Sequence, residues 1–492
     1  METAPSTLRT GPGPGGSAIA VEHPRPLVVD LDGTLFATDM LLETLLAVLG
    51  RNPAALIRPL LALRHGKAAL KQAAAAAGRF DPAVLPYDDA VLRRIHAARA
   101  AGRKVFLATA SDTVVAQAIA DHLGLFDGVF CSDGRHNLAG SAKAEQLVEA
   151  VGRGGFDYIG NDTADLPVWR EAGTCIAARA TPGVERLLRA LNPQAEFLPR
   201  PRLAAKPWLK CLRVHQYAKN ALILTPLFTA HAFDLASLGL AMLAILAFSL
   251  AASGNYILND LIDLGADRQH RSKRTRPLAS GRIPLGQGIA AVPVLLASGG
   301  LLAALISMQF LAVLLGYLAT SMLYSFWLKR VLLVDVVVLA LLYVTRVIAG
   351  AVAIAVPLSH WFLGFALFVF TCLALIKRYI ECAEQLRRGA ATVPRRAYAA
   401  MDAEALLQLA AAAGFNSITV LALYVSSDAV GNAYARPELL WLLCPIMIYW
   451  IARVVLLAHR GAVHDDPLVF ALTDRASLVT VALAAMAVLI AI

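Results

Sequence analysis

An acidic run, Asn259-Asp260-Leu261-Ile262-Asp263-Leu264-Gly265-Ala266-Asp267, follows directly on the long apolar segment 236–258. Asn259, Asp263 and Asp267 recur every four residues, so on a helix they form one stripe, with Asp260 beside it. Carboxylates packed this closely repel each other unless a cation lies between them. Hard oxygen ligands in this arrangement suit Mg²⁺, which keeps open positions for phosphate oxygens. A solvated, charged helix end is the alternative, but it does not require Asn259 in register.

Basic residues come immediately after the acidic run. They are Arg268, His270, Lys273, Arg274 and Arg276. A diphosphate ligand accounts for this order, because a metal held by the acids bridges its oxygens while the cations neutralise the leaving group. The ordinary excess of positive charge on the cytoplasmic side of a membrane accounts for some of these residues, but not for the whole cluster.

Composition places much of the chain in lipid. The 492 residues are 58% hydrophobic and 16% charged, whereas a soluble domain usually carries about 25% charged residues. Nine apolar segments are each near the length that crosses about 30 Å of hydrocarbon. They comprise residues 220–234, 236–258, 286–306, 309–328, 331–356, 360–379, 404–425, 437–458 and 475–492.

The loops between these segments predict the orientation. Lys and Arg gather after the second, fourth and sixth segments, whereas the alternate loops hold Arg436 and almost nothing else. The basic loops and the N-terminal part are therefore expected on the cytoplasmic side of a multi-pass inner-membrane protein. The net charge of +10 follows from the same bias and does not indicate nucleic-acid binding. The six cysteines form no CxxC pair and predict neither a metal site nor a disulfide framework.

The combined motif resembles a known family. Asn-Asp-x-x-Asp-x-x-x-Asp followed by Arg276-Pro-Leu-Ala-Ser-Gly281 is similar to the first aspartate-rich motif of the UbiA superfamily of intramembrane prenyltransferases. The resemblance covers roughly residues 205–492. It implies a bundle of nine transmembrane helices that binds a magnesium diphosphate in a central cavity facing the cytoplasm. It also implies a ligand set for Mg²⁺ of Asn259, Asp260, Asp263 and Asp267, with Asp260 and Asp263 also catalytic.

Further motifs resemble one branch of that superfamily, the decaprenyl-phosphate phosphoribosyltransferases, which move ribose 5-phosphate from phosphoribosyl diphosphate to a polyprenyl phosphate. They read Leu212-Arg213-Val-His-Gln216-Tyr-Ala-Lys219-Asn220, Tyr324-Ser-x-x-Leu-Lys329, Arg346-Val-Ile-Ala-Gly350 and Lys377-Arg378-Tyr379-x-Glu381. One departure is Val214, which stands where an Arg-Pro pair is common. This branch implies that the substrates are bound by Lys219, Asn220, Arg268, Lys273, Arg274, Arg276, Lys329, Arg346, Lys377 and Arg378.

The segment after the sixth span distinguishes this branch from the aromatic prenyltransferases. Those enzymes usually carry a second Asp-x-x-x-Asp motif there, whereas this chain has Lys377-Arg378-Tyr379-Ile-Glu381-Cys-Ala-Glu384. Extra cations suit a donor with an additional phosphate and an acceptor that is itself a phosphate. Prenyl transfer to an aromatic or quinone precursor is the first alternative, and a non-enzymatic lipid-phosphate carrier or scaffold is the second. Arg346, near the middle of the fifth span, is expected either to bind phosphate or to make structural hydrogen bonds.

Residues 27–190 alternate between strands and helices. Strands are expected at 27–29, 104–108 and 156–159, with a short apolar stretch at 128–131 and a helix-rich segment at 40–77. This order predicts an α/β domain with a doubly wound parallel sheet, whose ligands lie at the carboxyl ends of the strands. The first strand ends in Asp30-Leu-Asp32-Gly33-Thr34.

That ending resembles the first motif of the haloacid-dehalogenase-like phosphatases, and later motifs follow in order at Thr109, Lys143 and 161–165. The family implies that Asp30 attacks phosphorus to give an aspartyl-phosphate, and that Asp32 acts as general acid and then base. Thr109 and Lys143 would hold the phosphoryl oxygens, and segment 40–77 would form a cap. The implied ligands of Mg²⁺ are Asp30, Asp32, Asn161, Asp162 and Asp165.

Asn161 departs from the phosphatase pattern, because an acid usually stands at that position. Asp162 would replace it by a shift of one residue, and the alternative is an inert domain that positions or regulates the membrane half. The chain is thus predicted to comprise a flexible tail 1–26, a phosphatase-like domain 27–190, a linker 191–207 and a transferase domain 208–492. The membrane half would make a polyprenyl-phosphate ribose 5-phosphate, and the tethered soluble half would remove its 5-phosphate.

Overall fold

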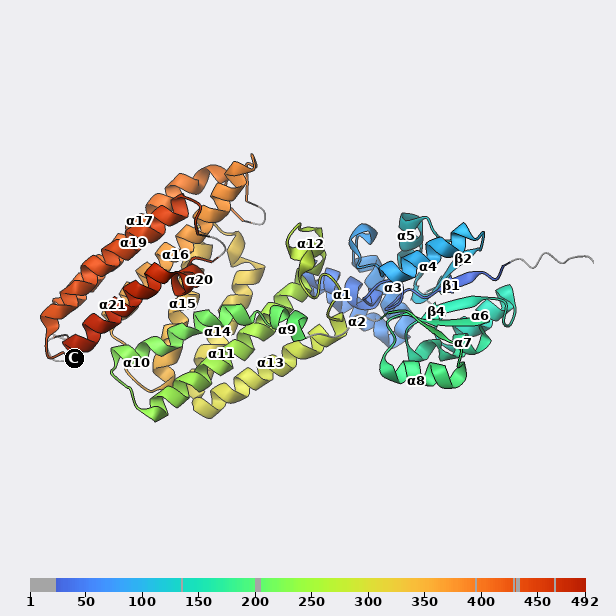
Figure 1. The fold of residues 1–492 in the computed structure, drawn as a ribbon, viewed down its shortest axis with the longest axis horizontal. Helices are drawn as coiled ribbons and strands as arrows, with labels where there is room; N and C mark the ends of the chain where they lie inside the picture. The colour runs from blue at the N-terminus through green and yellow to red at the C-terminus, as the bar shows by residue number, and fades with distance from the viewer. Residues whose placement is uncertain are drawn as a thin grey trace, which may run out of the picture. The chain divides into compact units, whose positions relative to one another are not determined.

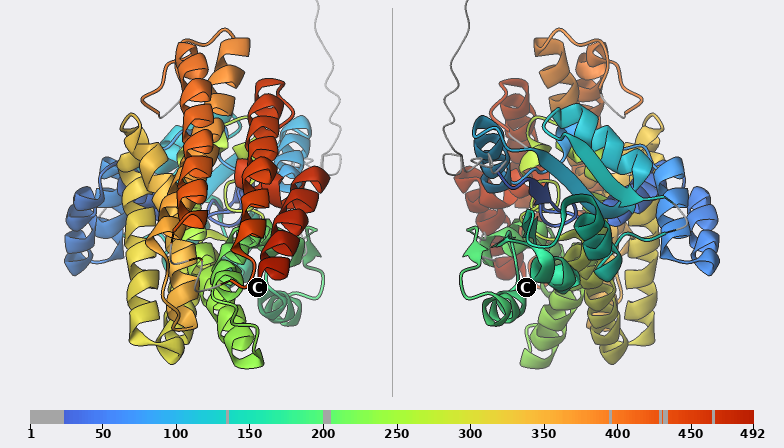
Figure 2. Two further views of the ribbon diagram at one scale, coloured as in Figure 1. Left: turned by 90° about the vertical axis from the view of Figure 1, so that its left-hand side faces the viewer. Right: turned by 90° about the vertical axis from the view of Figure 1, so that its right-hand side faces the viewer.

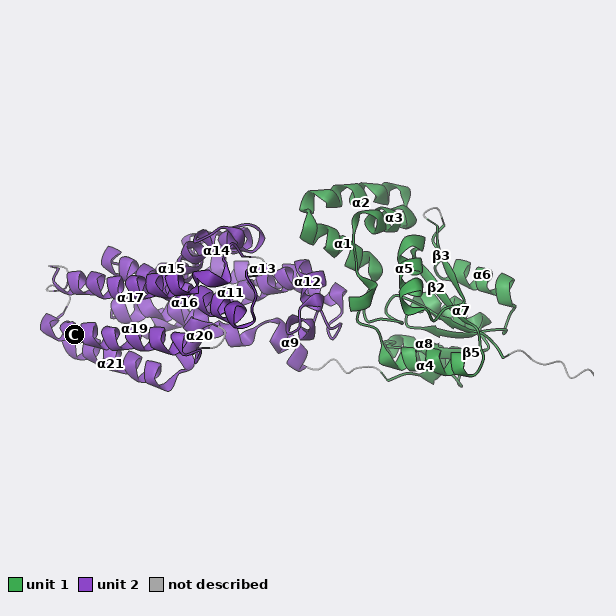
Figure 3. Ribbon diagram, turned by 90° about the horizontal axis from the view of Figure 1, so that it is seen from above, with its two compact units in different colours: residues 1–201 green, residues 202–492 purple. Residues whose placement is uncertain are grey.

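The computed structural model describes residues 24–133, 136–199, 205–393, 396–427, 430, 434–463 and 466–492. The chain divides into two compact units, Met1–Pro201 and Arg202–Ile492 (Figure 3). Residues 1–23 of the predicted tail and residues 200–204 of the predicted linker lie outside the described part of the chain.

Unit 1 is built on a six-stranded parallel sheet, as the alternation of strands and helices predicts. Its strands are β1 (Leu27–Val29), β2 (Val105–Asp112), β3 (Gly128–Ser132), β4 (Asp157–Gly160), β5 (Thr174–Ala177) and β6 (Glu196–Phe197). The strand order is β3-β2-β1-β4-β5-β6. Strands β1 to β3 are therefore added toward one edge of the sheet and β4 to β6 toward the other, so the switch point lies between the neighbouring strands β1 and β4. Ligands of doubly wound sheets bind at the carboxyl ends of the strands at such a switch point.

Both faces of this sheet are covered by helices. Alternate residues of a strand point to opposite faces, so Leu27 and Val29 pack with α4 (Asp89–Ala100) and α5 (Thr113–Leu123). Val28 packs on the other face with α6 (Ser141–Val151), α7 (Leu166–Glu171) and α8 (Pro182–Leu191). Figure 1 shows the two groups of helices on opposite sides of the strands. Burial on both faces explains why the strands read as continuous apolar runs.

The predicted helix-rich segment forms three helices, α1 (Met40–Arg51), α2 (Ile57–Ala62) and α3 (Lys67–Ala77). Asp39 caps α1, because its carboxylate accepts hydrogen bonds from the main-chain amides of Leu41 and Leu42. Short 3₁₀ turns, Pro53–Leu56 and Leu63–His65, join the three helices. We call this segment the cap.

The predicted linker begins too early. Strand β6 lies inside residues 191–207 and pairs in parallel with β5, and the compact unit extends to Pro201. A strand of two residues is too short to show a period-two pattern, so the sequence does not reveal it.

Unit 2 is helical, as predicted. Its long apolar helices include α11 (Leu235–Ile262), α13 (Leu285–Ile306), α14 (Met308–Phe326), α15 (Val334–Ala353), α16 (His360–Arg387), α17 (Ala403–Val425) and α19 (Leu443–His459). Seven helices in the described residues are long and apolar enough to cross a membrane. An eighth span results if α20 (Pro467–Thr473) and α21 (Arg475–Ala491), which meet at a 73° bend, count as one.

The prediction of nine spans is therefore not confirmed in the described part of the chain. The first predicted span, 220–234, is divided between a 3₁₀ helix, η5 (Val214–Leu224), and the five-residue α10 (Thr225–Thr229). His231 then adopts a left-handed φ of 53°, and Asp234 caps the start of α11. The apolar composition of this stretch led to the prediction of a span, but its backbone forms no single helix long enough to cross the bilayer.

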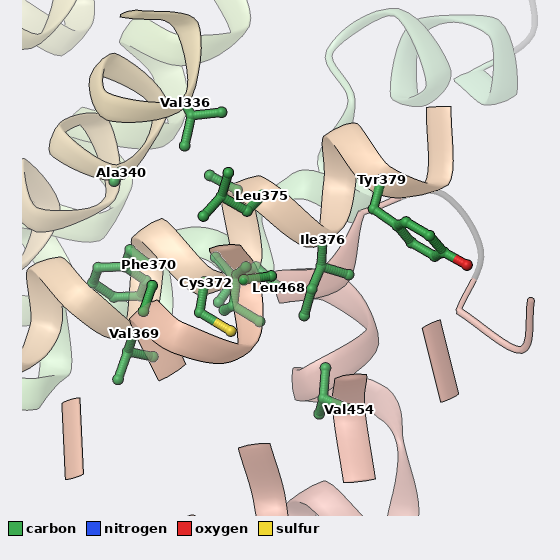
Figure 4. Packing of buried hydrophobic residues seen from close by; sticks show 14 of the residues in the cluster. Val336, Ala340, Val369, Phe370, Cys372, Leu375, Ile376, Tyr379, Val454 and Leu468 are labelled. Atoms are coloured by element: carbon green, nitrogen blue, oxygen red, sulfur yellow. The ribbon is translucent and has the colours of Figure 1, made fainter. Parts of the chain in front are cut away.

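One apolar cluster joins α15, α16, α19 and α20 (Figure 4). Leu468 of α20 belongs to it together with Cys372 and Ile376 of α16. Figure 2 gives two further views of these helices, in yellow to red. The packing holds the start of α20 against the middle of α16, and so determines which polar residues meet there.

Candidate active sites

Asp260 and Asp267 lie at the end of α11 and in the following helix, α12 (Leu264–Gln269), and both are buried. Nη1 of Arg276 lies 3.0 Å from Oδ1 of Asp260 and 2.6 Å from Oδ2 of Asp267. Arg213 also donates to Asp260, and Nζ of Lys273 lies 4.0 Å from Asp267. We call these five residues the acidic cluster. The two carboxylates are close enough to share one cation, and in this structure Arg276 is that cation.

The carboxylate of Asp263 lies near a further cation, Lys329. The helix predicted to carry the whole stripe ends at Ile262, and Asp263 stands at the junction between α11 and α12. Its Oδ2 lies 3.9 Å from Nζ of Lys329, which follows α14. Asn259 is half-buried on the last turn of α11. The amide of Asp263 still donates to the main-chain oxygen of Asn259 at 2.9 Å, and the amide of Asp267 donates to that of Asp263 at 2.8 Å, so the three residues follow one another on successive turns. Arg276 joins the side chains of Asp260 and Asp267.

Two of the predicted cationic residues occupy other environments. Arg268 is buried and donates from Nε to the main-chain oxygen of Ala279, 2.9 Å away. This contact fixes the loop that follows α12. Arg274 is exposed, in the short 3₁₀ turn Lys273–Thr275.

A second polar cluster forms where α16, α20 and η5 meet. Lys219 of η5 and Lys377 of α16 both donate to Oδ2 of Asp466, the latter over 3.1 Å. Asp466 is buried and caps α20 through the amide of Leu468. The hydroxyl of Tyr343 lies 3.4 Å from its other oxygen. We call Lys219 and Lys377 the lysine pair, and the motifs in the sequence did not identify Asp466 as their partner.

Arg346 is buried in α15 and donates to protein acceptors. Its Nε bonds to Oδ1 of Asn220 at 3.0 Å, Nη2 to the hydroxyl of Tyr317 at 2.8 Å, and Nη1 to the carbonyl of Leu342 at 2.5 Å. Gly350 permits this arrangement, because a Cβ there would lie 2.2 Å from the main-chain oxygen of Ile223 in η5. These bonds provide the structural role that the sequence left open, and a phosphate contact of Arg346 stays a prediction.

Arg378 points into a different network from its neighbour Lys377. It is 1% exposed, and its Nε lies 2.9 Å from Oδ2 of Asp335, although the pair is not aligned as a hydrogen bond. Its other nitrogens donate to Glu381 and to the hydroxyl of Tyr324. Arg396 lies 3.6 Å from the same oxygen of Asp335. This buried network ties α14, α15 and α16 together, which is a structural role.

Oxygen donors in the acidic cluster fit Mg²⁺. Among the described residues, no group of three or more His, Cys, Asp or Glu side chains is arranged to bind a metal by protein ligands alone. Mg²⁺ is commonly bound through one or two carboxylates together with phosphate oxygens of the substrate. Asp260 and Asp267, which already share the positive charge of Arg276, meet that requirement.

In unit 1 the predicted nucleophile lies at the sheet's switch point. Oδ1 of Asp30, just after β1, accepts a hydrogen bond from Nζ of Lys143 at 2.7 Å. Lys143 also lies 3.5 Å from Oδ1 of Asp165, so one buried cation serves two carboxylates. Burial raises the pKa of Asp30 to about 7, although Lys143 acts to lower it. The ionised form needed for attack therefore depends on nearby positive charge.

Asp32 is held beside Asp30 by two donors. The amide of Met40 and the hydroxyl of Ser111 each donate to its carboxylate at 2.7 Å. Burial, with a smaller contribution from Asp39, raises the pKa of Asp32 to about 6. A carboxyl with this pKa can donate a proton to a leaving group near neutral pH. The sequence motifs did not identify Ser111.

Thr109 is fully buried within β2, which extends to Asp112 and is longer than predicted. Its hydroxyl oxygen accepts from the amide of Ser111 at 2.9 Å. This contact shapes the end of β2, which lies next to β1 in the sheet. Thr109 therefore stands where the strand reaches the site.

Asp165 and Asn161 follow β4, the other neighbour of β1. Asp165 accepts from the hydroxyl of Tyr158 at 2.7 Å and from the amide of Asn161 at 2.9 Å. The side chain of Asn161 accepts from the hydroxyl of Thr34 at 3.2 Å. Gly33, with φ of 74°, leaves room for it, because a Cβ there would lie 2.2 Å from Nδ2 of Asn161.

Asp162 does not join this group. It is exposed, and its carboxylate accepts from the amide and hydroxyl of Thr163, so it caps the short turn that follows β4. Asp30 and Asp165, with the neutral oxygen of Asn161, are the oxygen donors here that could hold Mg²⁺.

Two protein families match the two units. Residues 222–473 match the UbiA prenyltransferase family, and residues 27–170 match the haloacid dehalogenase-like hydrolases. Protein y4nM of Sinorhizobium fredii is 38% identical over 455 residues, which cover 92% of this chain and 88% of the relative.

Decaprenyl-phosphate phosphoribosyltransferase of Mycobacterium tuberculosis is 36% identical over 190 residues, 37% of this chain and 62% of the relative. A solved UbiA homolog from Archaeoglobus fulgidus, bound to GPP and Mg²⁺, is 17% identical with a TM-score of 0.44, over 57% of this chain and 99% of the homolog.

The apolar helices and these matches together make the protein a multi-pass membrane enzyme. The chain belongs to the UbiA prenyltransferase family and carries a haloacid dehalogenase-like domain at its N-terminus.

Proposed function

We propose that unit 2 transfers a 5-phosphoribosyl group from phosphoribosyl diphosphate to a polyprenyl phosphate, at the cytoplasmic face of the inner membrane. One observation carries the proposal: cations outnumber carboxylates in the acidic cluster and at the lysine pair. Arg213, Lys273 and Arg276 meet two carboxylates in the acidic cluster, and the lysine pair meets Asp466. Excess positive charge in a partly buried site favours anionic ligands, because charge that is partly removed from water is stabilised by a counter-charge.

Two anionic substrates account for this charge better than a neutral acceptor does. A prenyl diphosphate donor needs one polyphosphate site, and an aromatic acceptor adds no negative charge. Phosphoribosyl diphosphate carries a 5-phosphate in addition to its diphosphate. We assign the diphosphate to the acidic cluster and the 5-phosphate to the lysine pair. The name of the mycobacterial relative supports the same donor.

The transfer joins an oxygen of the acceptor phosphate to C1 of the ribose and breaks the bond from C1 to the diphosphate. The attacking oxygen is already anionic, so the step needs no residue to remove a proton. Arg213 and Arg276 donate charge-assisted hydrogen bonds to the leaving diphosphate. Asp260 and Asp267 would hold Mg²⁺, which would supply further positive charge at the diphosphate oxygens. When the donor binds, Arg276 would leave the carboxylates of Asp260 and Asp267 and donate to the diphosphate oxygens instead.

Incubation of membranes with labelled donors tests this proposal. Ribose-labelled phosphoribosyl diphosphate and a polyprenyl phosphate should give label that extracts with lipid, and Asp260→Asn should abolish it. Labelled prenyl diphosphate with an aromatic acceptor is the matched control. Product from that control alone would favour the prenyltransferase alternative. No product from either donor would favour the carrier or scaffold.

We further propose that unit 1 removes the 5-phosphate from the transferred group. The support is the contact of Asp30 with Lys143 and of Asp32 with Ser111, since the reaction needs an activated nucleophile beside a proton donor. Asp30 would attack phosphorus to form an aspartyl-phosphate, Lys143 would hold the phosphoryl oxygens, and Asp32 would protonate the departing ribose oxygen. Water, losing a proton to Asp32, would then attack phosphorus and release phosphate from Asp30. Mg²⁺ would offset charge between Asp30 and the phosphate. Dephosphorylation of the purified lipid product, lost in Asp30→Asn, is the test.

A further inference from the structure

The cap carries an unusual concentration of exposed apolar side chains. Seven large apolar residues are exposed among the described residues of unit 1, and four of them lie between positions 57 and 63. Ile57 is 59% exposed, Leu60 56%, Leu61 47% and Leu63 49%. We call these four residues the apolar tip. A cluster of this kind on a soluble surface indicates a surface that another phase or molecule covers.

The charge around the apolar tip has one sign. Between Thr44 and Phe80 the sequence holds six Lys and Arg residues and no Asp or Glu. Arg58, Arg64 and Lys67 are exposed beside the tip. Apolar side chains bordered by Lys and Arg are typical of segments that lie in the interface of an anionic bilayer.

The inner side of the cap reaches the catalytic end of the sheet. Lys71 of α3 donates to the main-chain oxygen of Ala110 at 2.7 Å, at the end of β2. In Figure 3, α2 lies on the outer side of α3, away from the strands. The cap therefore has one side at the active site and an apolar, basic side that faces outward.

We propose that the apolar tip docks on the lipid bilayer, with anionic headgroups against Arg58, Arg64 and Lys67. A lipid surface is favoured over a protein partner because unit 1 is tethered to a membrane-spanning unit, with seven residues between β6 and α9 (Ala205–Cys211). The bilayer is thus always within reach. Docking holds the cap where a lipid-linked phosphate ester can reach Asp30 without leaving the membrane. The docking does not depend on the phosphatase being active.

Depth-dependent quenching in the full-length protein tests the docking. Cys131 and Cys444 are the partly exposed cysteines and are replaced by Ser, while the other four are buried. An environment-sensitive fluorophore is then attached at Leu60→Cys, in nanodiscs that contain nitroxide-labelled lipid. Leu187→Cys on α8 is the matched control, because Leu187 is 50% exposed, close to the 56% of Leu60.

The label at position 60 should be quenched several-fold more than the label at 187, and Leu63→Cys should repeat the result. Arg58→Gln with Arg64→Gln, or added salt, should reduce the quenching in anionic nanodiscs. Equal quenching at 60 and 187 would overturn the proposal. A label at 60 that is shielded from water but not quenched by lipid would also overturn it, and would show that protein covers the tip. If neither the Arg58→Gln, Arg64→Gln variant nor added salt changes the quenching, the proposed role of anionic headgroups would be overturned.

Discussion

Lys377 and Arg378 are adjacent in the sequence, but the structure predicts opposite consequences for their replacement by Gln. Lys377 lies in the lysine pair, which we assign to the donor's 5-phosphate. Arg378 is 1% exposed and pairs with Asp335, which is itself fully buried. One substitution should therefore weaken a ligand, and the other should weaken the fold.

The magnitudes follow from the contacts. Lys377→Gln removes one charge-assisted contact with phosphate, worth about 1.5–3 kcal/mol. That loss corresponds to a donor affinity about 10- to 150-fold weaker. Stability should change little, because Lys219 still pairs with Asp466. Arg378→Gln leaves Asp335 as a buried carboxylate without its closest cation, which costs about 3–5 kcal/mol. Nη1 of Arg396 lies 3.6 Å from Oδ2 of Asp335 and remains in the variant, so the loss of stability should lie near the lower end of this range.

Two measurements separate these effects. The donor concentration dependence of lipid-extractable label gives the apparent affinity, and thermal unfolding in detergent gives the stability. Arg388→Gln, in the exposed pair with Glu384 at the end of the same helix, should change neither. The reasoning fails if Arg378→Gln weakens the donor without destabilising the protein, or if Lys377→Gln leaves the donor affinity unchanged.

Three further predictions follow. Arg276→Gln should increase the affinity of the acidic cluster for Mn²⁺ in the absence of donor, measured by electron paramagnetic resonance, and should decrease the affinity for the donor. A decrease in both the Mn²⁺ affinity and the donor affinity would mean that Arg276 only supports the fold. Asp30→Asn should leave transfer intact and accumulate the 5-phosphorylated lipid, because an amide forms no aspartyl-phosphate; loss of transfer would show that the units are coupled. The Ser111 hydroxyl lowers the pKa of Asp32, so Ser111→Ala should raise that pKa and move the alkaline fall in dephosphorylation to higher pH; an unmoved pH profile would remove Asp32 as the proton donor.

The unit 1 site was largely predictable, because its residues follow successive strands. Asp30 follows β1 and Asp165 follows β4, and these strands are neighbours in the sheet. Ser111 was missed, since β2 continues beyond the predicted end at 108. Asp162 was predicted as a ligand of Mg²⁺, whereas the structure places its carboxylate in a cap, and the sequence held a signal for that cap. An acid three residues before Asp165 is the spacing of a capping box, and the structure shows that cap.

The site in unit 2 was less predictable, because it depends on contacts between distant segments. Asp466 meets Lys219, which is 247 residues earlier, and Lys377, which is 89 residues earlier. No local pattern links them. Asp260 and Asp267 were predicted to bind Mg²⁺, but a helical stripe does not reveal that the side chain of Arg276 lies between them. The direction of a long cationic side chain depends on the loop that follows α12.

The most direct test of the central claim uses phosphoribosyl diphosphate labelled differently in the ribose and in the diphosphate. The purified protein receives this donor with Mg²⁺ and a polyprenyl phosphate in nanodiscs, and lipid and water phases are separated. We predict that ribose label enters the lipid phase and that labelled diphosphate is released into the water phase, in equal amounts. Asp260→Asn should abolish both the transfer and the release, whereas Asp30→Asn should keep both. Both labels remaining in water, or both entering the lipid, would contradict phosphoribosyl transfer.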